Sequence, residues 1–203
     1  MVRYADDILI LCGSRAGADN ALRVAQNYLE GELKLTVNTT KTHIAHSGEG
    51  IKFLGAVVYT TYTHIQDKKV VRLKRTLKAL TKRNRGTGLA AIIRELNPVL
   101  RGFVSYFRVA NCARVLKQVM SWLRRRLRCI QLKQWKRPSR LHRRLKQLGY
   151  RPPFRHIKMQ SWRNAASPLA HHAIPNAWLH NDLGLVDLTK VRTGITVPEF
   201  GVS

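Results

Sequence analysis

The feature that most constrains the fold is the uneven distribution of charge along the chain. The 203 residues carry a formal net charge of +26. Residues 71–163 hold 27 Lys and Arg against a single acid, Glu95, whereas residues 1–70 and 164–203 are close to neutral. Solvated helix faces usually alternate in sign, and this segment does not. Because self-repulsion on that scale opposes a compact state unless a polyanion screens it, the segment predicts a folded basic domain with a polyanionic partner.

Apolar residues within the basic segment recur at helical spacing. Leu73, Leu77 and Leu80 follow each other at i, i+4 and i+7, which predicts a helix starting near Val71 and broken by residues 84–88. Such a helix can bury its leucines and leave its cations on the surface. A folded domain therefore fits this segment better than a disordered basic tail.

Two further helical stretches are expected in the same segment. Residues 89–108 predict a second helix, with a boundary or kink near Asn97 because Pro98 disfavours the helix at that point. Residues 112–134 predict a third helix, and residues 135–150 add further cations around Leu141, Leu145 and Leu148. The residues expected on the apolar face of the third helix are Val115, Val119, Trp122 and Leu123.

The N-terminal stretch places two adjacent carboxylates between apolar residues. Short apolar runs predict strands, and Asp favours turns, so Val2–Leu11 predicts a β-hairpin with Asp6 and Asp7 at the turn and Ile8–Leu11 entering a core. Two carboxylates at a tight turn repel each other unless a cation lies between them, and hard divalent cations such as Mg²⁺ take oxygen ligands. A solvated Asp-Asp turn is the simpler alternative.

The residues between this hairpin and the basic segment predict an α+β arrangement. A helix is expected over residues 18–30, with Leu22, Ala25 and Leu29 on one face. A strand is expected over residues 35–37, a polar turn over 38–42, a hairpin loop over 48–50 and a β-rich stretch over 51–62. This order suits half of an α+β palm.

Two motifs together indicate a family. Tyr4-Ala5-Asp6-Asp7 resembles the catalytic hairpin of reverse transcriptases, and the preceding Val2-Arg3 matches the group II intron form. The run from Asn97 to Phe107 resembles the Asn-Pro-x-Ile/Leu-Arg-Gly-x-x-x-Tyr-Tyr/Phe signature of the group II intron maturase domain. The chain thus resembles the C-terminal half of a group II intron-encoded reverse transcriptase/maturase. The expected divisions are the second half of the palm (1–68), a basic helical thumb/maturase domain (69–150) and a short C-terminal segment (151–203).

The resemblance implies catalytic roles for a few residues of the palm. Asp6 and Asp7 would be Mg²⁺ ligands in two-metal nucleotidyl transfer. Lys41, in a turn that resembles the family's Asn/His-x-x-Lys-Thr turn, would protonate the pyrophosphate leaving group; an ordinary exposed lysine is the alternative. The primer grip would consist of Phe53, Leu54 and Gly55, for which a packed strand with a bulge is the alternative.

The resemblance also implies that the helical domain lies beside RNA and an RNA/DNA template–primer duplex. Arginine forks suit phosphates, and duplexes containing RNA are recognised largely by shape, phosphates and 2′-hydroxyls. The residues expected to contact RNA are Lys74, Arg75, Lys78, Lys82, Arg101, Arg124, Arg125, Arg126, Arg128, Arg140, Arg143 and Arg144.

The family's fingers and first palm aspartate have no counterpart in the sequence. We therefore expect the chain alone not to polymerise, Mg²⁺ to bind only with the missing palm half, and the open apolar hairpin to bind an upstream chain or to self-associate. The chain is then part of an RNA-directed DNA polymerase/maturase. The alternatives are a non-catalytic RNA-binding maturase that assists splicing and a truncated remnant without activity of its own.

Other compartments and chemistries receive little support from the sequence. The three cysteines form no C-x-x-C pair, so neither a disulfide framework nor a zinc site is expected. We interpret His171, His172 and His180 as structural residues rather than metal ligands. Without a signal peptide or an apolar run of about 18 residues, we expect no membrane association and a location in the bacterial cytoplasm, in a ribonucleoprotein.

Overall fold

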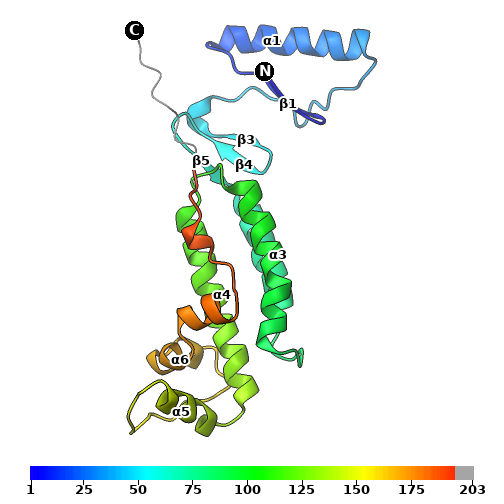
Figure 1. The fold of residues 1–203 in the computed structure, drawn as a ribbon. Helices are drawn as coiled ribbons and strands as arrows, with labels where there is room; N and C mark the ends of the chain where they lie inside the picture. The colour runs from blue at the N-terminus through cyan, green and yellow to red at the C-terminus, as the bar shows by residue number, and fades with distance from the viewer. Residues whose placement is uncertain (195–203) are drawn as a thin grey trace. The chain divides into compact units, whose positions relative to one another are not determined.

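A computed structural model describes residues 1–194 of the chain, which divides into two compact units (Figure 1). The first unit runs from Met1 to Gln66 and the second begins at Asp67. The first contains two small antiparallel sheets and one α-helix, and the second is built mainly from helices. The α+β class, with a partial palm followed by a helical domain, is therefore confirmed.

The N-terminal hairpin forms as expected, but its turn lies one residue earlier. Strand β1 (Val2–Tyr4) pairs antiparallel with β2 (Asp7–Leu9), and Tyr4 is paired with Asp7. The turn consists of Ala5 and Asp6, with Ala5 in the left-handed region at φ 49°. The placement of both aspartates at the turn was thus wrong for Asp7, because pairing with Tyr4 makes Asp7 the first residue of a strand.

The aliphatic residues after the turn do not enter a core. Ile8 is 42% exposed, Ile10 38% and Leu11 69%, so the expected burial of Ile8–Leu11 is wrong in this structure. The hairpin is a two-stranded sheet, and a single hairpin has no second layer against which to bury a face.

Helix α1 (Arg15–Asn27) starts three residues earlier than expected because Ser14 caps it, its Oγ accepting a hydrogen bond from the Gly17 N–H at 3.1 Å. The helix continues as a single π-helical turn, η1 (Tyr28–Glu32). The strand expected over residues 35–37 is absent. In its place the Val37 N–H donates to Glu30 Oε1 at 3.2 Å, so this backbone group bonds a side chain rather than a neighbouring strand.

A three-stranded antiparallel sheet ends the first unit. Its order is β3 (Ile51–Phe53), β4 (Ala56–Val58) and β5 (Thr63–Ile65). A short 3₁₀ turn, η2 (Ser47–Glu49), precedes β3 where a hairpin loop was expected. The β3–β4 turn is Leu54 and Gly55, both with left-handed φ (47° and 83°), the conformation of a two-residue hairpin turn that follows the twist of the strands. Gly55 is therefore a turn residue and not the isolated strand glycine that we expected.

The second unit is organised around three long helices and two shorter ones. They are α2 (Asp67–Leu80), α3 (Leu89–Phe107), α4 (Ala113–Trp135), α5 (Pro138–Gln147) and α6 (Pro168–Ala173). Their apolar stripes meet in a core from which solvent is nearly excluded. Among its fully buried members are Leu77, Leu96, Leu100, Leu116, Leu123, Leu127, Leu141 and Leu145.

A boundary or a kink was expected near Asn97; helix α3 continues through Pro98, so the boundary is not found there. Proline inside a helix removes one hydrogen bond at a cost of about 3 kcal/mol. Leu96 and Leu100, both fully buried, stabilise the helix on either side of this position. The Asn97 side chain faces the C-terminal segment, where Nδ2 donates to Gly184 O at 2.9 Å and Oδ1 accepts from the Val186 N–H at 3.0 Å.

The C-terminal segment packs into the second unit. Its short turns η3 (Asn164–Ala166), η4 (Trp178–Asp182) and η5 (Leu188–Lys190) follow α5, and η3 and η5 lie against α4 (Figure 1). The buried side chains of this segment include Ile157, Ala165, Ile174, Leu179, Leu185 and Leu188. None of the helices in residues 1–194 is both long and apolar enough to cross a bilayer.

Candidate nucleic-acid interface

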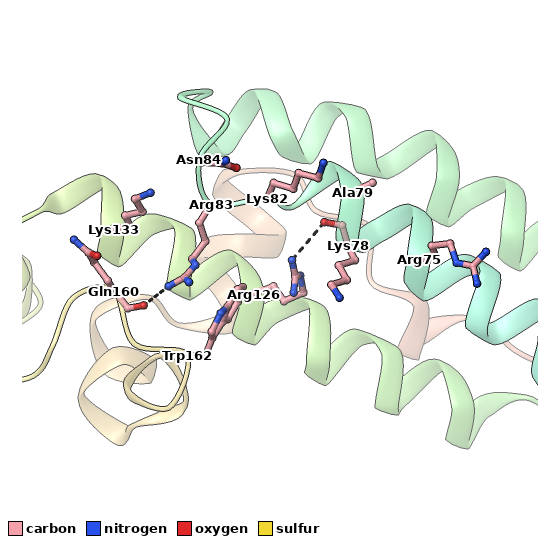
Figure 2. A pocket seen from close by; sticks show the side chains of 10 residues that line it. All are labelled: Arg75, Lys78, Ala79, Lys82, Arg83, Asn84, Arg126, Lys133, Gln160 and Trp162. Atoms are coloured by element: carbon pink, nitrogen blue, oxygen red, sulfur yellow. Dashed lines mark hydrogen bonds between the residues drawn. The ribbon is translucent and has the colours of Figure 1, made fainter.

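A cleft of about 630 Å³ lies in the second unit, between α2, α4 and the segment after α5 (Figure 2). Six of its ten lining residues are cationic, and none is acidic. The lining residues are Arg75, Lys78, Ala79, Lys82, Arg83, Asn84, Arg126, Lys133, Gln160 and Trp162. Four of the residues expected from the sequence to contact RNA therefore lie together, although they come from separate parts of the chain.

Helix α2 and the loop after it supply one side of the cleft. Arg75 and Lys78 lie three residues apart on the exposed part of α2, and Lys82 follows the end of the helix at Leu80. The buried leucines of α2 fix this orientation, because positions three and four residues apart share a face of a helix. No carboxylate of the described residues pairs with any of these three cations.

Arg126 on α4 is held by the end of α2. Its Nε donates to Thr81 Oγ1 at 2.6 Å, and its Nη2 donates to Thr81 O at 2.9 Å. Its guanidinium lies 4.6 Å from the ring centroid of Trp162 and 5.1 Å from that of Trp122. Burial is the main cause that lowers the pKa of Arg126, and the nearby cations Arg83 and Arg125 lower it further.

Arg83 is held from the other side of the cleft. Its Nη1 donates to the backbone carbonyl of Gln160, as Figure 2 shows, and its guanidinium lies 4.7 Å from the ring centroid of Trp162. Trp162 thus carries two guanidinium groups over its ring. Arginine stacks on aromatic rings in this way, whereas the compact ammonium of lysine does so less well.

Sequence reasoning missed six of the ten lining residues: Ala79, Arg83, Asn84, Lys133, Gln160 and Trp162. The last two belong to a segment that we had set apart as a C-terminal appendage. An arginine just past the end of a basic helix and a tryptophan within a basic stretch were the only signals available. Neither signal predicts that Arg83 stacks on Trp162, which lies about 80 residues further along the chain.

The other predicted RNA contacts divide by exposure. Arg101, Arg125, Arg140 and Arg143 are exposed and lie outside the cleft, and Lys74, Arg124 and Arg144 are half-buried. Arg124 Nη1 lies 3.2 Å from His180 Nε2, and the Arg144 guanidinium lies 5.8 Å from the ring centroid of Trp178. These two arginines therefore also support the C-terminal segment.

Arg128 does not fit a surface role. It is 2% exposed, donates from Nε to Ile174 O at 2.9 Å and from Nη2 to Asn176 Oδ1 at 2.6 Å, and burial lowers its pKa to about 10. Its place in the predicted RNA-binding set is corrected on this basis, because a buried guanidinium with internal partners has no face for a phosphate. Arg128 joins α4 to the chain after α6.

The residues expected to be catalytic or to form the primer grip lie in three separate parts of the first unit. Asp6 is in the β1–β2 turn and Asp7 begins β2, both exposed. Lys41 is exposed in the polar turn, where Asn38 Oδ1 accepts the N–H groups of Thr40 and Lys41 at 3.1 and 3.2 Å. Phe53, Leu54 and Gly55 form the β3–β4 corner. Within residues 1–194 no hydrogen bond or ion pair joins Asp6 or Asp7 to Lys41.

The metal-binding capacity of these carboxylates is incomplete. Asp6 and Asp7 offer the hard oxygen donors that Mg²⁺ prefers. Among residues 1–194, however, no three His, Cys, Asp or Glu side chains gather where they could hold a metal ion. The described part of the chain therefore contains two neighbouring carboxylates here and not the three or more side chains of a metal site. We derive no reaction step through a metal from this chain alone.

Comparison with known families matches both units. Residues 70–149 match the family described as Group II intron, maturase-specific domain, and residues 1–58 match Reverse transcriptase (RNA-dependent DNA polymerase). The "Putative COX1/OXI3 intron 2 protein" of Saccharomyces cerevisiae is 44% identical over 61 residues, 30% of this chain and 7% of that protein. "Protein YkfC" of Escherichia coli K12 is 34% identical over 92 residues, 45% of this chain and 23% of that protein.

These matches define the chain as an intron-associated protein of the reverse-transcriptase and maturase class. The two family matches follow one another along the chain and together cover most of it. Both units are thus similar to parts of group II intron-encoded reverse transcriptase/maturases, as the motifs had indicated. It spans 7% and 23% of the length of the two curated relatives.

Proposed function

We propose that the chain binds group II intron RNA, and the RNA/DNA template–primer duplex of its family, through the basic second unit. The observation that carries this proposal is the cleft, which six cations from α2, the loop after α2 and α4 line without a carboxylate among them. The family match supports an intron RNA as the polyanion. The excess charge of residues 71–163 is then balanced by phosphates.

The energetics favour nucleic acid as the partner. Each phosphate neutralised by Lys or Arg releases condensed counterions, so affinity falls steeply with salt. Glu95, the one acid of residues 71–163, is already paired with Arg85 at 2.8 Å. The remaining cations of that segment have no acid within it, which leaves their charge available to a polyanion.

For the first unit we propose a role in an assembled palm. Asp6 and Asp7 would supply two of the Mg²⁺ ligands. When bound, the ion would provide the chemistry of two-metal nucleotidyl transfer. Lys41 would donate a proton to the leaving pyrophosphate, and Phe53, Leu54 and Gly55 would support the primer end. The third carboxylate would come from an upstream chain that covers the exposed faces of Ile8, Ile10 and Leu11.

A second candidate function is a maturase that binds intron RNA, assists splicing and performs no chemistry. The observation that favours it is the contrast between an incomplete set of metal ligands and a basic unit with its own core. A remnant without activity would share this structure. Under either of the RNA-binding proposals the chain acts within a ribonucleoprotein, which we place in the bacterial cytoplasm.

The test is binding of the purified chain to a folded group II intron transcript at increasing salt. We expect retention at about 150 mM salt and a log–log salt slope that corresponds to several phosphates, about 0.9 for each contact on a duplex. Asp6→Asn with Asp7→Asn is the matched control and should leave RNA affinity unchanged. Failure of the chain to retain the transcript at moderate salt would contradict the proposal.

A second assay separates the two candidate functions. The chain is mixed with the upstream half of a related reverse transcriptase, and extension of a primer on an RNA template is measured. If the chain is half of a polymerase, extension appears only in the mixture and is abolished by the Asp6→Asn, Asp7→Asn pair. Unchanged RNA binding without extension supports the non-catalytic maturase.

A further inference from the structure

We infer that the cleft between α2 and α4 is a built site for consecutive phosphates of one nucleic-acid strand, completed by the segment after α5. Trp162 and the Gln160 carbonyl hold two arginines as fixed donors on its floor, and four further cations surround them. This inference rests on the proposed RNA binding and deepens it. It names the place and the chemical group that is bound.

The first support is that the fixed arginines keep unused donors. Arg126 uses Nε and Nη2 on Thr81 and the Lys78 carbonyl, which leaves the two N–H groups of Nη1 without a partner among the described residues. Arg83 uses Nη1 on Gln160, which leaves Nε and Nη2. Guanidinium N–H groups presented in a fixed plane match the geometry of phosphate oxygens.

The second support is the character of the surrounding cations. Arg75, Lys78, Lys82 and Lys133 line the cleft, and their side chains make no hydrogen bond or ion pair within the described residues (Figure 2). Six positive charges around one cleft greatly exceed the single charge of one phosphodiester. A run of phosphates along a strand is the anion that matches such a number.

The state of Trp162 argues against recognition of a base. Sequence-tolerant binding of single strands usually relies on open aromatic faces on which bases stack. Here the indole is half-buried and lies under Arg83 and Arg126. Its role is therefore to position the two guanidiniums, and the site should read the backbone without regard to sequence.

The two arginines are already ordered before a ligand binds, so the site favours anions whose oxygens fit the fixed positions of their N–H groups. Arg83 and Arg126 are held near each other although both are positive, and burial and mutual repulsion lower the pKa of Arg126. A bound phosphate removes that repulsion. Because the side chains are already ordered, little rotamer entropy is lost on binding.

The first experiment preserves charge and removes only geometry. In the pair Arg83→Lys, Arg126→Lys the charge is constant, but the stacked, forked donors are lost. We expect affinity for a 12-nucleotide oligouridylate at 100 mM salt to fall about 10-fold, on the order of 1.4 kcal/mol, with an unchanged salt slope. The matched control is Arg94→Lys, Arg114→Lys, two exposed arginines outside the cleft and outside the predicted RNA-contact set; this variant should change the affinity by less than about 2-fold.

The second experiment uses side chains that support no part of the fold. Lys78→Gln with Lys82→Gln should lower affinity for the same oligonucleotide and reduce the salt slope by about 1.4, at roughly 0.7 per lost phosphate contact. Arg114→Gln with Lys117→Gln removes the same charge from exposed positions of α4, outside the cleft and outside the predicted RNA-contact set, and should leave the slope nearly unchanged. Melting temperatures of all four variants verify that they are folded.

The outcomes separate this inference from the proposed function. If the chain binds RNA and the cleft pairs behave like the controls, the inference is overturned while RNA binding stands. If the chain binds no RNA, both are lost. The inference would also be overturned if, in a competition assay, inorganic phosphate displaced the bound oligonucleotide as well as an unlabelled oligonucleotide does at the same total phosphate concentration. A site for consecutive phosphates must prefer phosphates linked in one strand.

Discussion

The two units of the chain differ in the size of their hydrophobic core and in their net charge. In the first unit the large apolar side chains that become buried are Val57 and Ile65, among the described residues. In the second unit α3 alone buries seven residues, among them Ile92, Ile93 and Leu96. The first unit is thus poor in core and nearly neutral, whereas the second carries almost all the net charge on a dense core.

This difference in core and charge indicates which unit can form a functional site from its own residues. The geometry of the basic cleft is set within the second unit, because Thr81, Gln160 and Trp162 fix its arginines. The Tyr-Ala-Asp-Asp hairpin has a fixed register but little around it. A hairpin with exposed isoleucines needs another surface before its carboxylates are held rigidly.

The largest expected effect is in backbone protection. Amides of α4 near Leu123 should exchange hydrogen with the global unfolding of the second unit, and amides of β2 near Ile8 by local opening. We expect protection factors to differ by at least about 10³-fold, on the order of 4 kcal/mol. Hydrogen exchange followed by mass spectrometry measures this difference. Equal protection of both segments in the isolated chain would break the comparison.

The next prediction compares core deletions in the two units. Leu123→Ala creates a cavity in a fully buried position and should cost about 2–5 kcal/mol of the free energy of unfolding. Ile8→Ala changes a side chain that is 42% exposed and should cost well under about 1 kcal/mol. Urea denaturation followed by circular dichroism gives both values. A larger loss for Ile8→Ala would mean that the hairpin is buried in solution, for example by self-association.

A third prediction separates arginines that hold the fold from arginines that face solvent. Arg128→Ala leaves Ile174 O and Asn176 Oδ1 without their donor and should cost about 1–3 kcal/mol of stability. Arg125→Ala, on the exposed side of the same helix, should change stability by less than about 0.5 kcal/mol. Thermal unfolding of the two variants tests this. If Arg125 proved the more important for stability, the structural role given to Arg128 would be wrong.

The sequence was sufficient for features that depend on local pattern. Leu73 and Leu77 at helical spacing predicted α2, and the apolar periodicity of residues 112–134 predicted α4 to within one residue at each end. The Asn97–Phe107 run and the Tyr4–Asp7 hairpin were sufficient to indicate the two families that residues 70–149 and 1–58 match. Such signals are carried by neighbouring residues, so a single sequence contains them.

Features decided by distant partners could not be predicted. A helix was expected over residues 89–108, but whether Pro98 would end it depended on tertiary burial of its neighbours, which outweighs local propensity. Four arginines of α4 look alike in the sequence: Arg124, Arg125, Arg126 and Arg128. Only the placement of Thr81 and Trp162 shows that Arg126 lines a cleft, and only that of Ile174 shows that Arg128 is buried. The aliphatic run after Asp7 indicated a strand correctly but could not indicate whether a second layer covers it.

The smallest expected effect concerns acid stability and the C-terminal segment. Burial alone would raise the pKa of Asp187, but hydrogen bonds from the Thr189 hydroxyl and N–H, at 2.6 and 3.0 Å, outweigh it and lower the pKa below its ordinary value. A carboxylate with a lowered folded-state pKa stabilises the fold above its unfolded pKa, near 4, and this contribution is lost as the pH falls through the folded value.

Asp187→Asn should therefore reduce stability by less than about 1 kcal/mol at pH 6 and make unfolding less dependent on pH between pH 5 and about pH 3. Asp19→Asn is the matched control, since Asp19 is an exposed carboxylate of the first unit whose contact is a 3.4 Å surface pair with Arg15. Urea midpoints measured across this range compare the two variants. A larger loss of pH dependence for Asp19→Asn than for Asp187→Asn would reverse the comparison. Acid sensitivity would then arise in the first unit, which has little core, and not where Asp187 helps to hold the C-terminal segment against α4.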